Sequence, residues 1–163
     1  MEEIHIEKAT LSDANKILAI QRVAYLSEAE IYDDYRIPPL TQSLAEMEAV
    51  FQAHVFYVAK VNGEVVGSVN IKAEGSTGVI GRLVVMPNRQ SQGIGSMLMG
   101  HVEANHAELE TFELFTGHKS ERNLSFYRKR GYQECRRQRV HEKLELVFMC
   151  KMNAKYHIPR EGL

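Results

Sequence analysis

Apolar residues recur at two different spacings along this chain, and the alternation between the two spacings predicts a mixed α/β order. Near the N-terminus, Ile4 and Ile6 alternate with polar residues, which is typical of a short edge strand. Helical spacing then predicts two helices, over Ala14–Tyr25 and Thr41–Phe51. Between them lies the acidic, tyrosine-rich segment Ser27–Leu40, in which two consecutive prolines indicate a stop.

The middle of the chain predicts three consecutive strands. Val55–Lys60 and Glu64–Lys72 are rich in β-branched residues, and the Asn62-Gly63 pair between them suits the positive φ angles of a tight hairpin turn. The third strand, Val79–Val85, is almost continuously apolar, which indicates burial on both of its faces.

The rest of the chain alternates between helix and strand. The predicted elements are a helix over Gly93–Glu108 with Ile94, Met97, Leu98 and Val102 inward, a strand Phe112–Thr116, a helix Asn123–Arg130 closed by Gly131, and two antiparallel strands, Tyr132–Arg139 and Leu144–Met152. The predicted order is β-α-α-β-β-β-α-β-α-β-β, in one domain over residues 1–153 with a C-terminal tail at 154–163.

Composition and charge narrow the classes of function. The 163 residues are 44% hydrophobic and 25% charged, which excludes disordered and fibrous proteins. A net charge of −1 argues against a broad nucleic-acid surface. Neither a signal peptide nor an apolar run of membrane-spanning length is visible, so a cytoplasmic location without a membrane partner is expected. In that compartment Cys135 and Cys150 are expected to be reduced thiols, and they do not suggest a metal site.

The stretch most informative about chemistry joins the strand that ends before Pro87 to the helix that begins at Gly93. A glycine-containing loop at such a junction leaves backbone N–H groups pointing outward, and the helix dipole adds to their attraction for an anion. Glycine at positions 93 and 95 allows a phosphate to approach these amides. No lysine follows the glycines, which disfavours a nucleoside triphosphate loop, and Leu98 replaces the third glycine of the dinucleotide fingerprint.

Two motifs in this chain resemble those of the GCN5-related N-acetyltransferase (GNAT) family. The first is Gln90-Ser-Gln-Gly-Ile-Gly95, three residues after Pro87. The second is Asn123, followed by Phe126-Tyr127 and Gly131-Tyr132. The order of predicted elements is also similar to the family fold, a mixed, mostly antiparallel sheet flanked by helices.

The resemblance implies an acetyl-CoA-dependent N-acyltransferase with a CoA thioester and an amine as its partners, in a family where homodimers are common. It places the pantetheine arm of acetyl-CoA in a gap between Arg82–Val85 and Phe112–Thr116. A backbone N–H near Val84 or Val85 would polarise the thioester carbonyl. The cofactor contacts that it implies in this part of the chain are Leu83, Val84, Val85, Gln90, Ser91, Gln92, Gly93, Ile94, Gly95 and Ser96.

In the second motif, the resemblance implies that Tyr127 protonates the leaving thiolate and that Asn123, Phe126 and Lys129 contact the cofactor. The residue types leave structural alternatives open. Tyr127 also suits a buried aromatic position, Asn123 a helix cap, and Lys129 an exposed basic helix face.

The sequence departs from the family where a general base is expected. Many members have Glu or Asp on the strand before the proline, where this chain has Arg82. Many also have Asn seven residues before the tyrosine, where this chain has Ser120. The candidate bases are Glu28, Glu30, Asp33, Asp34, Glu74 and His118, and the alternative is that water removes the proton.

These features predict direct transfer of an acetyl group from acetyl-CoA to a primary amine, of a small molecule rather than a protein, within a ternary complex. The alternative is an acyl-CoA-binding sensor or interaction domain without turnover. The two hypotheses differ in whether an amine causes the release of free CoA thiol.

Overall fold

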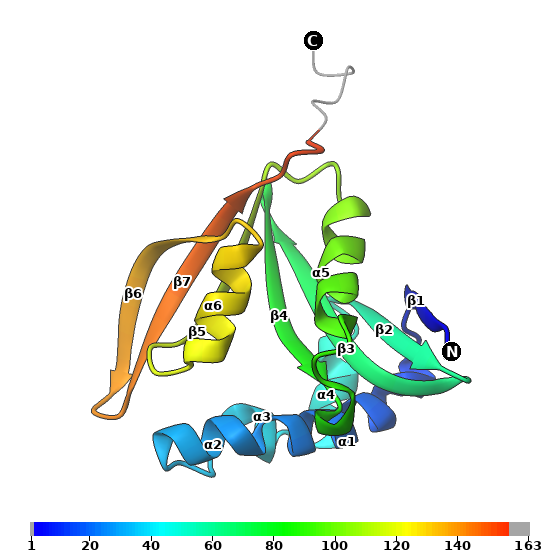
Figure 1. The fold of residues 1–163 in the computed structure, drawn as a ribbon, viewed down its shortest axis with the longest axis horizontal. Helices are drawn as coiled ribbons and strands as arrows, with labels where there is room; N and C mark the ends of the chain where they lie inside the picture. The colour runs from blue at the N-terminus through cyan, green and yellow to red at the C-terminus, as the bar shows by residue number, and fades with distance from the viewer. Residues whose placement is uncertain (1, 157–163) are drawn as a thin grey trace. The chain divides into compact units, whose positions relative to one another are not determined.

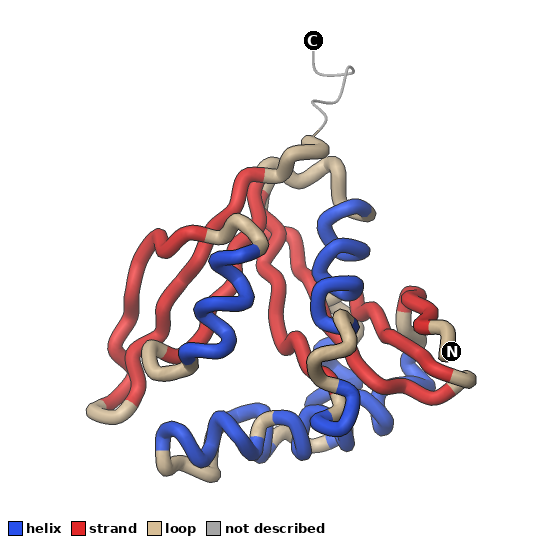
Figure 2. Tube along the Cα trace, in the orientation of Figure 1, coloured by secondary structure: helices blue, strands red, loops and turns tan. Residues whose placement is uncertain are grey.

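The computed structural model describes residues 2–156. These residues contain seven strands, hydrogen-bonded in the order β1-β2-β3-β4-β5-β7-β6, together with helices (Figures 1 and 2). The predicted fold class, a mixed and mostly antiparallel sheet flanked by helices, is confirmed. Two compact units divide the chain, residues 2–72 with Gly81–Val102, and Ala73–Ile80 with residues 103–156. In this part of the chain no helix has the length and apolar content needed to cross a membrane.

The first unit holds the N-terminal elements and the predicted anion site, Gln90–Ser96. Its elements are β1 (Ile4–Lys8), α1 (Ala14–Ala24), α2 (Leu26–Tyr32), α3 (Pro38–Thr41), α4 (Leu44–Val50), β2 (Val55–Val61), most of β3 (Glu64–Glu74), the later part of β4 (Thr77–Val85) and most of α5 (Ile94–Ala104). β2 pairs antiparallel with both β1 and β3. The predicted turn between β2 and β3 is confirmed, because Asn62 and Gly63 have φ angles of 51° and 79°.

The acidic, tyrosine-rich segment Ser27–Leu40 is largely helical. Residues 26–32 form α2, which ends at Asp33 in a left-handed conformation. The two prolines do not stop a helix: Pro38 and Pro39 stand in the first turn of α3, where proline loses no helical hydrogen bond. The helix predicted from Thr41 begins instead at Leu44, because the Ser43 side chain accepts the backbone N–H of Glu46 and caps α4.

The core of the first unit is built from the apolar faces of these elements. Ile17 and Leu18 of α1, Met47 of α4, and Phe56 and Val58 of β2 are buried in one cluster. α5 buries Ile94, Leu98, Met99 and Val102. The inward placement predicted for Met97 is wrong, since its side chain is 40% exposed, and Met99 lies inward in its place.

The second unit contains three further strands, one further helix, the start of β4 and the last residues of β3 and α5. Its elements are β5 (Thr111–Gly117), α6 (Glu121–Lys129), β6 (Gln133–His141) and β7 (Leu144–Met152). The first residues of β4, Thr77–Val79, pair in parallel with Thr111–Glu113 of β5. β7 pairs antiparallel with β5 on one side and with β6 on the other. The predicted helix end at Gly131 is confirmed by its φ of 96°.

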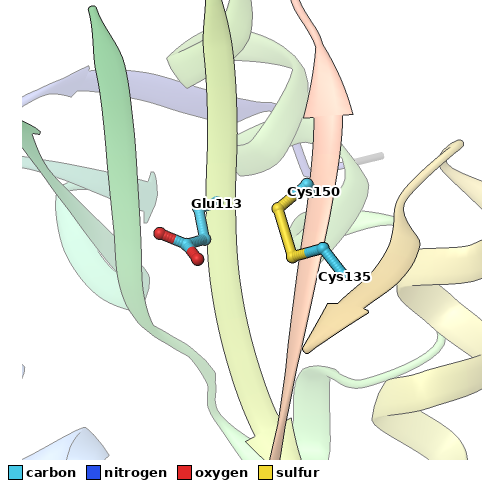
Figure 3. Close-up of side chains that lie close together, drawn as sticks. All are labelled: Glu113, Cys135 and Cys150. Carbon is cyan, nitrogen blue, oxygen red and sulfur yellow. A yellow bond between two sulfur atoms is a disulfide. The ribbon is translucent and has the colours of Figure 1, made fainter. Parts of the chain in front are cut away.

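The expectation that the two cysteines are reduced thiols is wrong in this structure. Cys135 of β6 and Cys150 of β7 form a disulfide, as Figure 3 shows. Their Cα atoms are 6.1 Å apart. The expectation came from the compartment, whereas strand pairing decides the distance between the two side chains. The carboxylate of Glu113, which is directly opposite Cys150 on β5, lies within 4.8 Å of both sulfurs.

Candidate active site

The loop between β4 and α5 has the exposure and backbone geometry of an anion site. After the short 3₁₀ turn Pro87–Arg89, all residues from Gln90 to Gly93 are exposed. Two of them, Ser91 and Gly93, have positive φ angles, of 67° and 81°. Such left-handed residues alternating with others turn successive N–H groups toward one side. A Cβ atom built on Gly93 would meet no other atom within 4 Å, so the space beside this backbone is open.

Close packing fixes the start of α5 behind this loop. Ile94 is only 1% exposed, so its side chain belongs to the core and it offers a ligand its backbone alone. A Cβ atom on Gly67 of β3 would lie 3.0 Å from the Val84 carbonyl oxygen and 3.2 Å from both Ile94 and Leu98. β3 thus approaches α5 and β4 at a distance that only glycine allows, which positions the helix N-terminus.

The β4 residues before the loop are interrupted by an unusual backbone conformation. Arg82 has a φ of 50°, a left-handed conformation that a non-glycine residue rarely adopts within a strand. Val84 is buried, whereas Leu83 and Val85 are half-buried. This break directly precedes Leu83–Val85, the residues whose main chain is predicted from the resemblance to bind the thioester. A bulge at such a position changes the direction of a strand.

The Arg82 side chain joins a network of polar groups on the helices of the first unit. Its Nη1 donates to the Gln42 side-chain oxygen at 3.2 Å, and that oxygen also accepts from Gln21 at 2.9 Å. Gln21, which is 1% exposed, donates in addition to the Pro39 carbonyl at 3.0 Å. Burial raises the pKa of the Tyr25 hydroxyl, and the charge of Arg82 acts on it in the opposite direction. Tyr25 is therefore neutral at physiological pH.

In the second unit, α6 presents the residues of the second motif. The Asn123 side chain donates to the hydroxyl of Thr116 on β5 at 3.2 Å, and it lies in the first turn of the helix rather than at its cap. Tyr127 is half-buried and makes edge-to-face contacts with the rings of Phe126 and Tyr132. Phe126 is also half-buried, and Lys129 is exposed.

The end of α6 is held in place by an acidic group. Tyr132, only 1% exposed, donates its hydroxyl hydrogen to Glu103 at 2.7 Å. Arg130 and Lys151 form ion pairs with the same carboxylate, at 3.1 Å and 3.3 Å. Burial and this hydrogen bond raise the pKa of Tyr132. The Gly-Tyr part of the second motif thus has a structural role: it closes the helix that carries Tyr127.

Comparisons with known proteins agree with the motifs. A protein-family model described as "Acetyltransferase (GNAT) domain" matches residues 52–134, about half of the chain. This chain belongs to the GNAT acetyltransferase family. The matched domain is an acetyltransferase domain, in agreement with the predicted class of N-acyltransferases.

Solved GNAT structures share the fold over almost the whole chain. The ribosomal-protein-S18-alanine N-acetyltransferase of Escherichia coli is 15% identical, with a TM-score of 0.77 and 97% of each chain covered. YncA of Salmonella typhimurium, solved with its cofactor acetyl-CoA, is 18% identical, with a TM-score of 0.74 and 96% of this chain and 97% of that chain covered. At these identities the likeness shows the fold alone.

A longer relative aligns by sequence. UPF0157 protein YqkA of Bacillus subtilis is 29% identical over 134 residues, which are 82% of this chain. The alignment spans 38% of that relative, so this GNAT chain corresponds to a part of it.

Among the candidate bases, the structure bears most directly on His118. Its Nδ1 lies 3.0 Å from the backbone nitrogen of Glu145 and 3.2 Å from the Glu145 carbonyl oxygen, so it accepts from the N–H in one tautomer and donates to the carbonyl in the other. His118 therefore has a structural bond between β5 and β7. Of the acidic candidates, Glu28 and Asp34 are half-buried, and Glu30, Asp33 and Glu74 are exposed.

Sequence reasoning missed Gln21 and Gln42, whose side chains join the hydrogen-bond network of Arg82. No motif marks them, and they come within hydrogen-bonding distance only because α1 and the α3–α4 connection pack together. A weak signal existed for Gln21. Gln21 falls on the apolar face of α1, and a polar side chain buried on such a face ordinarily has a hydrogen-bond partner.

Proposed function

We propose that this chain transfers an acetyl group from acetyl-CoA directly to the primary amine of a small molecule, within a ternary complex. The observation that carries the proposal is the exposed loop Gln90–Gly93 with its two left-handed residues, which leads into α5 in a chain of the GNAT family. Outward N–H groups and a helix N-terminus suit the pyrophosphate of CoA. The main chain of Leu83–Val85 binds the pantetheine arm and the thioester.

The chemistry requires a neutral amine, a polarised carbonyl and a protonated leaving group. The amine nitrogen attacks the thioester carbon, the C–N bond forms, and the C–S bond breaks. A backbone N–H near Val84 or Val85 donates to the oxyanion, which develops negative charge in the transition state. Holding both reactants together supplies much of the acceleration, so no covalent enzyme intermediate is needed.

Two protons move during the transfer. The proposal gives Tyr127 the role of the acid that donates a proton to the CoA thiolate, with Asn123, Phe126 and Lys129 as cofactor contacts. The proposal has the amine give up its proton to water, since Arg82 stands where many relatives have an acid.

The test is a thiol-release screen of the purified chain with acetyl-CoA and four acceptor classes: polyamines, amino acids, aminoglycosides and peptides with free N-termini. Amine-dependent release of CoA thiol, with acetylated product confirmed by mass spectrometry, supports the proposal. Acetyl-CoA binding by calorimetry, without release for any acceptor, contradicts it and favours an acyl-CoA sensor.

A further inference from the structure

Arg82 has a neutral hydrogen-bond partner rather than a carboxylate among residues 2–156. Its side chain is partly buried, and its guanidinium donates to a neutral group, the side-chain oxygen of Gln42. Among residues 2–156, no carboxylate forms an ion pair with it. Charged groups that leave bulk water are ordinarily paired, so this environment favours an additional anion.

Two other partly buried arginines show the usual arrangement. Arg89 pairs with Glu2 in the first unit, and Arg130 pairs with Glu103 in the second. Their side chains are 26% and 20% exposed, so partial burial in this chain is accompanied by a carboxylate in both cases. Arg82 differs from these two arginines because its side-chain partner is the neutral amide of Gln42.

The guanidinium of Arg82 is held in place before any ligand arrives. The Gln42 oxygen that accepts from it also accepts from Gln21, and the Gln42 carbonyl accepts from Arg22 at 3.0 Å. A side chain fixed at both its amide oxygen and its backbone keeps one orientation. A guanidinium has five N–H donors, so the bond to Gln42 leaves enough of them for the bidentate geometry that a carboxylate prefers.

The position of Arg82 relates this charge to the acceptor, and this step rests on the proposed acetyl transfer. Arg82 directly precedes Leu83–Val85, the residues proposed to hold the thioester, and adjacent Cα atoms are about 3.8 Å apart. An amine that attacks the thioester must therefore approach the region that the guanidinium reaches. A cation alone would repel an ammonium group there, whereas a carboxylate on the same molecule compensates it.

We propose that Arg82 binds a carboxylate of the acceptor, so that the substrates are amines with a carboxylate a few bonds from the amino group, as in α-amino acids. The ion pair orients the amino group toward the thioester. Arg82 is in this sense a specificity-determining residue at the position where many relatives have an acid.

The experiment compares each amino acid with its carboxamide and with the amine that lacks the carboxyl group, in the thiol-release assay. The wild-type chain should prefer the free acid by roughly tenfold to a hundredfold in kcat/KM, the range expected for a charged hydrogen-bonded contact. In Arg82→Gln the KM for the acid should rise by a similar factor, while the KM for the carboxamide stays unchanged. Arg82→Lys, which keeps the charge without the planar fork, should fall between them.

Two controls separate recognition from folding. Lys16→Gln removes one exposed positive charge from α1 and should leave the preference for the acid intact. Calorimetry should give Arg82→Gln the same affinity for acetyl-CoA as wild type, which a misfolded variant would not retain. The carboxylate site is refuted if wild type turns over acids and carboxamides at equal rates, or if Arg82→Gln loses activity toward both equally. Either result is still consistent with acetyl transfer. Absence of turnover with every amine overturns both.

Discussion

The disulfide between β6 and β7 should stabilise the folded protein by an amount that depends on the number of residues between the two cysteines. Cys135 and Cys150 are 15 residues apart, and closing a loop of this length restricts the unfolded chain by about 3 kcal/mol at 25 °C. Cys135 is exposed and Cys150 is half-buried, so breaking the bond exposes little core. We therefore expect reduction to lower the free energy of unfolding by about 3 kcal/mol, mainly through the unfolded state.

Urea unfolding followed by far-UV circular dichroism measures this difference, with protein purified in air and divided into oxidised and reduced samples. The reduced sample should unfold at lower urea concentration, and the oxidised sample should have the smaller m-value because its unfolded chain is more compact. The Cys135→Ser/Cys150→Ser variant is the matched control: it should unfold like the reduced wild type and not respond to reductant.

The reasoning would be refuted by equal unfolding midpoints for oxidised and reduced protein, with thiol labelling confirming the state of each sample. Two free thiols in protein that was purified in air would refute the bond itself.

Three substitutions test the site and its support. Tyr127→Phe should lower kcat by about tenfold or more while leaving the acetyl-CoA affinity nearly unchanged, and an unaltered kcat would exclude the acid role. Gly93→Asp adds strain at a φ of 81° and a negative charge beside the loop, so calorimetry should show acetyl-CoA binding weakened by roughly tenfold or more; retained affinity would place the pyrophosphate elsewhere. Gly67→Ala should cost about 1–3 kcal/mol in urea unfolding, because its Cβ would lie 3.0 Å from a backbone oxygen, and a wild-type midpoint would show that α5 moves freely.

The sequence predicted best where one local rule decides the structure. Asn62-Gly63 determines a hairpin turn whatever surrounds it, and periodic apolar positions identified the long helices α1 and α5. The residues around Pro38 were misjudged because proline both ends helices and begins them, and only the neighbouring chain decides between the two.

The cysteine error has a different origin. Counting back from the turn at Glu142–Lys143 would have set Cys135 opposite Cys150 in an uninterrupted ladder, so the signal was present. The actual ladder contains two register shifts, and Gln133 is the residue opposite Cys150. These shifts depend on side-chain packing that no local pattern reveals.

The candidate site was predicted as far as its motifs extend. The exposed loop Gln90–Gly93 falls where the spacing of the motif places it, and its use as a cofactor site stays a prediction. The bond between Arg82 and Gln42 was beyond prediction, because it joins residues 40 positions apart in the sequence.

β6 is the edge strand at one end of the sheet, and all nine of its residues are exposed. An exposed edge strand is a template on which another chain can add, the first step toward aggregation. β6 carries Arg136, Arg137 and Arg139, and its two register shifts disturb the regular spacing of its backbone groups. Such charges and such irregular spacing oppose the edge-to-edge association of strands.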